Sequence, residues 1–169
     1  MRKFDQWPSA RAALLLFVGA GVVFVVLRVS ILIAGPETVP GHFSFDGTVT
    51  RFDPTLGFLV FIGLFAVGLA GLCLAAARLP VECINLPRRE EWNTPERRAR
   101  LRALLTAGLR VMGAATLLLL AAMLAISRYV GLGGQIDSWI LAVAAGGCVV
   151  AIAIVAGRML AGGRYTPPG

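Results

Sequence analysis

Four long apolar runs decide what this chain can fold into. A helix needs about 20 apolar residues to cross the hydrocarbon core of a bilayer, which is about 30 Å thick. The sequence of 169 residues contains four such runs, which we predict as transmembrane helices over residues 12–34, 56–77, 102–126 and 139–158. The segments between them are too short for a separate soluble domain, so we predict a single all-α membrane domain over residues 1–169, a four-helix transmembrane bundle.

The composition fits a membrane domain better than a soluble one. The chain is 57% hydrophobic and 15% charged, whereas soluble domains carry about 25% charged residues. The formal net charge of +7 raises the question of nucleic-acid binding. The arginines, however, lie at the borders of the apolar runs. We therefore expect them to contact anionic lipid headgroups at the cytoplasmic face, and we expect no nucleic acid as a partner.

The polar segment between the second and third runs predicts the orientation. Residues 78–102 contain seven arginines and four glutamates, and loops rich in Lys and Arg stay in the cytoplasm. Both termini are then cytoplasmic as well. Of the 16 basic residues only Lys3 is a lysine, which indicates a GC-rich bacterial genome. We predict a multi-pass protein of the bacterial inner (cytoplasmic) membrane.

Arg28 is a charge inside the first apolar run. A charge near the bilayer centre costs about 2.5–3.5 kcal/mol on insertion scales. Its side chain could extend outward to the interface, because Arg28 precedes the outer end by six residues, or about 9 Å. Alternatively, Arg28 pairs with an outer carboxylate or lines a polar cavity. The cavity would suit a small transport or channel component.

The outer loop after the first helix predicts a small extracytoplasmic β-hairpin. Asp46-Gly47 stands between two alternating segments, and such a pair favours a two-residue turn with positive φ at both positions. Phe43 and Phe45 would then share one face. At the end of this loop, Asp53 is predicted as the N-cap of the second helix, with Pro54 as its first residue.

The third helix has a clear predicted start. Thr94 is a suitable N-cap, Pro95 a suitable first residue, and Glu96 lies near the positive end of the helix dipole. No breaker follows before about Ile126. The fourth helix carries pairs of small residues four positions apart, which favour close helix packing, so we predict that it is the most closely packed of the four. These pairs are Ala142/Gly146, Gly147/Ala151 and Ala153/Gly157.

His42 is the only histidine and shares the outer loop with Glu37, Asp46 and Asp53. One imidazole and two carboxylates could bind a metal ion. In a hairpin turn, however, Asp46 would direct its side chain at local backbone, so we predict no metal site. His42 is then a hydrogen-bonded structural residue or a partner contact. The sequence contains none of the common nucleotide, hydrolase or metalloprotease motifs, so we predict neither an enzyme nor a cofactor.

Two motifs carry a family resemblance. The outer loop reads Pro40-x-His42-Phe43-x-x-x-Gly47, and the inner loop reads Asn85-x-Pro87 followed by Trp92-x-x-Pro95-Glu96-Arg97-Arg98. Together they resemble the SdpI-type bacterial membrane proteins, over roughly residues 12–126. The N-terminal module of that family is a domain of unknown function with this outer loop after its first helix. The resemblance implies immunity to a secreted toxin or sequestration of a regulator at the membrane. Longer members carry helices that this chain lacks.

These observations predict a non-catalytic accessory or regulatory membrane protein, SdpI-like in kind. It would contact another membrane protein or a second copy of itself through the outer loop (residues 37–53) and the basic inner loop (residues 81–102). The alternatives are a transport or channel component in which Arg28 lines a polar path, and a toxin immunity protein. The predicted contact residues are His42, Phe43, Phe45, Asp46, Trp92, Glu96, Arg97 and Arg98.

Overall fold

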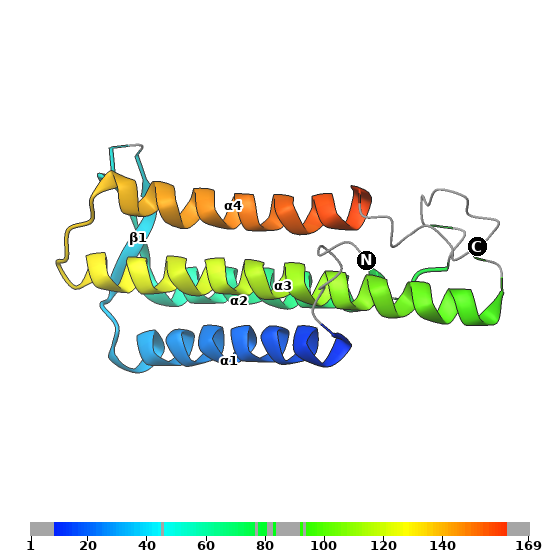
Figure 1. The fold of residues 1–169 in the computed structure, drawn as a ribbon. Coiled ribbons are helices and arrows are strands. Elements are labelled where there is room, and N and C mark those ends of the chain that lie inside the picture. The colour runs from blue at the N-terminus through cyan, green and yellow to red at the C-terminus, as the bar shows by residue number, and fades with distance from the viewer. Residues whose placement is uncertain are drawn as a thin grey trace.

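The computed structural model describes residues 9–44, 46–76, 78–80, 83, 92 and 94–161, with only the backbone of 145, 148 and 158–161. Its four helices are long and apolar enough to cross a membrane, and a two-stranded antiparallel sheet follows the first of them (Figure 1). This confirms the predicted fold. The elements in chain order are α1 Ala10–Ala34, β1 Thr38–Phe43, β2 Val49–Pro54, α2 Thr55–Ala76, α3 Pro95–Gly131 and α4 Ser138–Ala161.

Helix α3 is the centre of the molecule. In Figure 1 it lies between α1 and α4, with α2 close by, and it contacts all three other helices. Helix α1 packs along much of α3, whereas α1 and α2 touch each other over a short stretch. Helix α4 packs mainly against α3. The hairpin lies at one end of the molecule, and the start of α1 and the end of α4 lie at the other.

The core is built by α1, α2 and α3. On α1 the buried positions follow one another at intervals of seven, four and seven residues, the spacing of a helix seam. Van der Waals packing holds such seams together in lipid, where small side chains allow close approach. Gly113 of α3 is one example, because a Cβ there would lie 2.7 Å from the ring of Phe17. The buried cluster contains Ala20, Phe24, Ile31, Leu59, Ile62, Ala66, Ala114, Leu117, Leu120, Ala121 and Leu124.

Helix α4 contradicts its prediction of close packing. None of its residues whose side chains are described is buried. A Cβ added at Gly146, Gly147 or Gly157 would meet nothing within 4 Å. The physical reason is that α4 packs mainly against one helix, α3, so that a side chain added at Gly146 or Gly157 meets no neighbour. Small residues permit close packing, but a neighbour must also be present.

The hairpin is fixed to both α2 and α3. Thr55, the first residue of α2, donates from its backbone N–H to the Glu37 carbonyl (3.0 Å) and from its hydroxyl to the Pro36 carbonyl (2.5 Å). From α3, the buried Ser127 hydroxyl donates to the Pro40 carbonyl at 3.4 Å. Gly131 brings α3 so close that a Cβ would lie 2.7 Å from Pro36 Cγ. The outer loop is therefore part of the folded body.

Two predicted helix boundaries are wrong for the same reason, because tertiary contacts at the hairpin override the local signals. Asp53 does not cap α2, since it pairs with Val39 in the sheet and its carboxylate binds Arg51, so β2 runs to Pro54 and α2 begins at Thr55. Helix α3 ends at Gly131 and not near Ile126, and its added last turns hold the hairpin.

The hairpin turn also differs from the prediction. Ser44 accepts from the N–H of Gly47 (3.0 Å) and donates to the carbonyl of Thr48 (2.8 Å). The loop between Ser44 and Thr48 thus has three residues and not two. Gly47 adopts φ of 88° at the end of this turn, the left-handed position that three-residue hairpin loops give to glycine.

Candidate functional site

His42 lies on the exposed face of the hairpin, between two irregularities of the sheet. Pro40 pairs with Phe52, His42 with Arg51 and Phe43 with Val49, so Gly41 and Thr50 have no partner in the ladder. Nδ1 of His42 lies 2.7 Å from the Thr50 hydroxyl, which also donates to the His42 carbonyl at 3.4 Å. His42 is therefore hydrogen-bonded within the hairpin, which agrees with the prediction of a structural residue.

The carboxylates of the outer loop have partners of their own. Asp46 accepts from the backbone N–H of Thr48 (3.0 Å) and from its hydroxyl (2.7 Å). The hydroxyl bond is the main cause that lowers the pKa of Asp46 below its usual value of 3.8. Asp53 binds Arg51 at 2.9 Å. In the described part of the chain, no three His, Cys, Asp or Glu side chains gather into a metal site.

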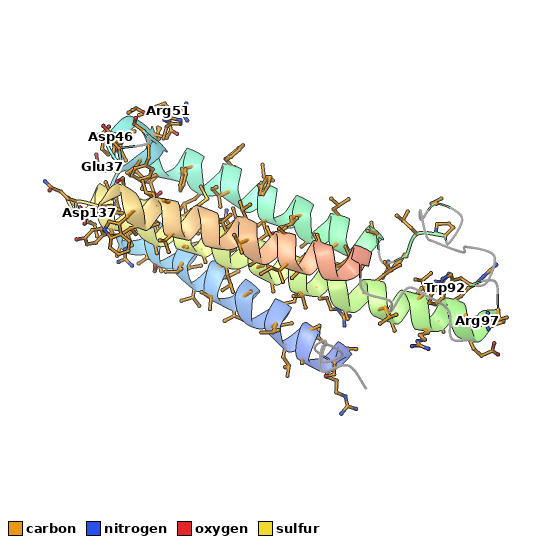
Figure 2. All side chains as sticks on the ribbon, turned by 45° about the horizontal axis from the view of Figure 1, so that its top comes forward. Glu37, Asp46, Arg51, Trp92, Arg97 and Asp137 are labelled. Atoms are coloured by element: carbon orange, nitrogen blue, oxygen red, sulfur yellow. The ribbon has the colours of Figure 1, made fainter. Side chains whose placement is uncertain are left out.

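The outer polar surface includes more than the hairpin. Figure 2 shows Glu37, Asp46, Arg51 and Asp137 at the same end of the molecule, with Trp92 and Arg97 at the other. The tip of the hairpin touches the start of α4, since a Cβ on Gly47 would lie 3.1 Å from the Ile136 carbonyl oxygen. We define the outer surface as residues 37–53 together with Asp137. Sequence reasoning missed Asp137, which no motif marks.

Of the two predicted outer aromatics, the structure describes one. Phe43 is half-buried at the end of β1, so it presents only part of its ring. Phe45 lies outside the described residues. Phe52, which was not predicted, is an exposed aromatic side chain of the hairpin.

Trp92 does not offer a surface to a partner. Its side chain is 0% exposed and packs against Leu101 and Leu105 of α3. The prediction of Trp92 as a contact residue is therefore wrong in this conformation, because its large apolar ring covers the leucine face of the helix. The predicted helix start is confirmed: the Thr94 hydroxyl accepts from the Arg97 N–H at 3.4 Å, and Pro95 is the first helical residue. Glu96 follows, exposed, in the first turn.

The arginines of the first turns of α3 fall into two pairs. Arg97 and Arg98 are half-buried and both engage in interactions. Arg100 and Arg102 are exposed. The predicted contact residues Arg97 and Arg98 thus make interactions within the protein. The exposed positive charges are Arg100 and Arg102, which the sequence analysis did not predict as contact residues.

This basic part of α3 projects beyond the other helices. Nη1 of Arg110 lies 3.5 Å from the carbonyl of Ala10, the first residue of α1, so the two residues are at the same level. Residues 95–109 of α3 therefore extend past α1, as Figure 1 shows. At 1.5 Å per residue the projection is about 22 Å. We call residues 95–109 the α3 arm.

Arg28 follows neither predicted explanation as stated. Its side chain crosses from α1 to α2, where Nε donates to the Leu59 carbonyl at 3.1 Å. Gly63 provides the space, because a Cβ there would lie 2.7 Å from both Cζ and Nη2 of the guanidinium. Among the described residues no carboxylate forms an ion pair with Arg28. A backbone carbonyl leaves no signal in a sequence, so only Gly63 could have indicated this contact.

Comparisons of the chain with family models, with curated proteins and with solved structures gave no match. The resemblance to SdpI-type proteins therefore stays a prediction.

A second polar link, near the hairpin end of the bundle, joins α1 to α3. Nη1 of Arg128 donates to the Ser30 hydroxyl at 3.2 Å, and that hydroxyl donates to the Leu27 carbonyl at 2.8 Å. With the Ser127 bond to β1, the last turns of α3 are attached to α1 and to the hairpin. The described arrangement can therefore present charged groups at both ends of one rigid helix.

Proposed function

We propose that this protein is a non-catalytic accessory or regulatory protein of the bacterial inner membrane. It contacts a partner protein through the outer surface and through the α3 arm. The observation that carries the proposal is the continuity of α3, a helix of 37 residues. Its last turns hold the hairpin, its middle is in the core, and its first turns project beyond α1. A partner that contacts both surfaces would therefore contact two ends of the same rigid element.

The charge distribution supports an orientation with the α3 arm in the cytoplasm. Among the residues whose side chains the structure describes, the hairpin side has three basic residues and four acidic ones, which are Arg28, Arg51, Arg128, Glu37, Asp46, Asp53 and Asp137. The arm side has seven basic residues and one acidic one, which are Arg11, Arg78, Arg97, Arg98, Arg100, Arg102, Arg110 and Glu96. The described charges therefore sum to 7 − 1 = +6 on the arm side and 3 − 4 = −1 on the hairpin side. Cytoplasmic loops carry such an excess of positive charge.

Anionic lipids are a second proposed contact. They would bind closer to the bilayer than the partner does, near the start of α1. Arg110 is level with the start of α1, and Arg11 is exposed there. These two side chains suit the headgroup layer, which is about 5–8 Å deep. Arg100 and Arg102 lie about 12–15 Å farther out along α3, beyond that layer. We therefore assign Arg100 and Arg102 to an acidic surface of the partner.

Two alternative functions are a transport or channel component and a toxin immunity protein. A transport or channel component needs a polar path past this residue, whereas its guanidinium covers Gly63 and donates to Leu59. We therefore treat Arg28 as a packed residue and not as the wall of a path. A toxin immunity protein would be one form of partner binding through the outer surface, and the same experiments would detect it.

Crosslinking from chosen positions in cells tests the proposal. A photoreactive amino acid at Arg100 or at Thr50 should capture the same partner, because both side chains are exposed at the proposed surfaces. The control position is Val26, which is exposed on α1 within the membrane-spanning part and should capture none.

Charge reversal gives the matched comparison. Arg100→Glu with Arg102→Glu should reduce partner recovery at least about fivefold, since rim charges change association by roughly 1 kcal/mol. Arg11→Glu, an exposed charge at the level of the lipid headgroups, should leave recovery unchanged. The proposal fails if mild-detergent purification from cells in several growth conditions recovers this chain alone.

A further inference from the structure

Arg28 is a cation with a neutral partner. Its Nε donates to the Leu59 carbonyl at 3.1 Å, and its guanidinium lies against Gly63. No carboxylate among the described residues forms an ion pair with Arg28. A carbonyl satisfies one of the five N–H donors of a guanidinium. The other donors and the charge still require a partner.

The depth of the Arg28 guanidinium in the membrane limits which partners can reach it. Arg28 precedes the end of α1 by six residues, or about 9 Å, and Leu59 and Gly63 follow the start of α2 by about 6 and 12 Å. The guanidinium therefore lies inside the outer half of the hydrocarbon layer. Unsatisfied N–H groups are costly there, and a membrane adapts to a buried arginine by drawing headgroups and water inward.

The surroundings of Arg28 suit an acyl chain beside the charged group. Arg28 is half-buried, so part of the side chain faces outward from the seam between α1 and α2. Val29 and Val60, which neighbour Arg28 and Leu59 along their helices, are exposed apolar residues. A fixed guanidinium edge next to apolar surface matches a phosphate with a hydrocarbon tail, because arginine binds phosphate oxygens in pairs.

We propose that Arg28, seated on Gly63, binds the phosphate of a phospholipid of the outer leaflet at the seam between α1 and α2. The phosphate neutralises the guanidinium and accepts from the donors that Leu59 leaves free. The ligand chemistry is a phosphate monoanion. Its expected source is a lipid, because a free phosphate ion would have to leave water to reach this depth. The proposal does not depend on partner binding.

Native mass spectrometry of the detergent-purified protein tests this. The probes are phosphatidylglycerol, a diacylglycerol with the same acyl chains, and inorganic phosphate. The measurements use protein with Arg11→Gln and Arg110→Gln, which removes the lipid contacts proposed for the other end of the molecule. We expect one molecule of phosphatidylglycerol bound per chain of this protein, and diacylglycerol bound at least about tenfold more weakly, the effect of losing charge-assisted hydrogen bonds. Inorganic phosphate should not displace the lipid. If it does, the same site takes its phosphate from solution.

Three variants separate the site from general charge effects. Arg28→Leu should weaken phosphatidylglycerol binding about tenfold or more. Gly63→Leu keeps the charge but fills the space of the guanidinium, so it should weaken binding as well. Arg51→Gln removes the same charge from the exposed hairpin and should have no effect.

The proposal is overturned if folded Arg28→Leu or Gly63→Leu protein binds phosphatidylglycerol as the wild type does, with folding checked by thermal unfolding. If neither variant folds, the wild-type protein decides: equal binding of diacylglycerol and phosphatidylglycerol overturns the proposal, and a clear preference for the phospholipid supports it.

Discussion

The three helices of the core and helix α4 are made of similar residues but are packed very differently. Helices α1 and α4 are both apolar enough to cross a membrane. Helix α1 buries one seam against α3, whereas α4 buries no described side chain. Apolar composition places a helix in lipid, since lipid tails and apolar side chains are alike. A helix is joined to its neighbours by complementary shape, such as the ring of Phe17 over Gly113, and by hydrogen bonds such as the one from Arg128 to Ser30.

The largest contrast should come from one substitution made in both regions. Gly113→Leu forces a side chain into the space of the Phe17 ring and should destabilise the protein by about 3 kcal/mol, the upper range for overpacking. Gly146→Leu meets open space and should change stability by less than about 0.5 kcal/mol. Reversible unfolding in bicelles measures both. Equal losses would show that α4 has a close neighbour in the membrane.

A cavity should have a smaller but similar effect. Leu124 is 0% exposed in the core, whereas Val149 of α4 is 65% exposed. Leu124→Ala should cost about 2 kcal/mol, the lower end of the range for leucine, because in lipid the packing loss is the main term. Val149→Ala should cost almost nothing in the same unfolding measurement. A larger loss of stability for Val149→Ala than for Leu124→Ala would contradict the difference in packing between the core and α4.

The attachment of the hairpin to the core should depend on single hydrogen bonds. Ser127→Ala removes the bond to the Pro40 carbonyl and should cost about 1 kcal/mol. Hydrogen exchange of β1 should then become faster. Thr106→Ala is the control, because its hydroxyl bonds to Arg102 within α3. If both variants changed β1 equally, the Ser127 bond would not be what holds the hairpin.

The smallest effect should be on the pH dependence of the turn. The pKa of Asp46 is below 3.8 in the folded protein because Thr48 donates two hydrogen bonds to it. A lowered folded pKa means that this carboxylate stabilises the turn above pH 3.8 and loses that effect as the pH falls through the folded value. The protection of the Thr48 N–H against hydrogen exchange, relative to the rate for an unprotected amide at the same pH, should therefore fall in acid. Asp46→Asn should remove this dependence, and an unchanged profile would contradict it.

Signals that act locally predicted much of the fold. The length of each apolar run gave the four helices, Thr94-Pro95 gave the start of α3, and Asp46-Gly47 gave a hairpin. Each of these depends on a few residues in succession. The predicted Asp46 contact with local backbone is confirmed for the same reason.

The features that the sequence did not predict depend on contacts between distant residues. The small residues of α4 were expected to pack closely, but the pattern does not say whether a second helix lies opposite them. Arg28 binds the carbonyl of Leu59, a group that every residue carries. Trp92 was predicted at a surface because no local pattern marks its contact with Leu101, a residue nine positions further along the chain.

The junction between the hairpin and α2 has a mechanical consequence. β2 ends at Pro54 and α2 begins at Thr55, with no residue between them to act as a hinge. Thr55 also fastens the chain that arrives from α1. A force on the hairpin therefore acts on α2 as a torque. A tilt of this helix would move its far end, which is about 33 Å away at Ala76, so a load on the hairpin would change the geometry at the opposite end of the bundle.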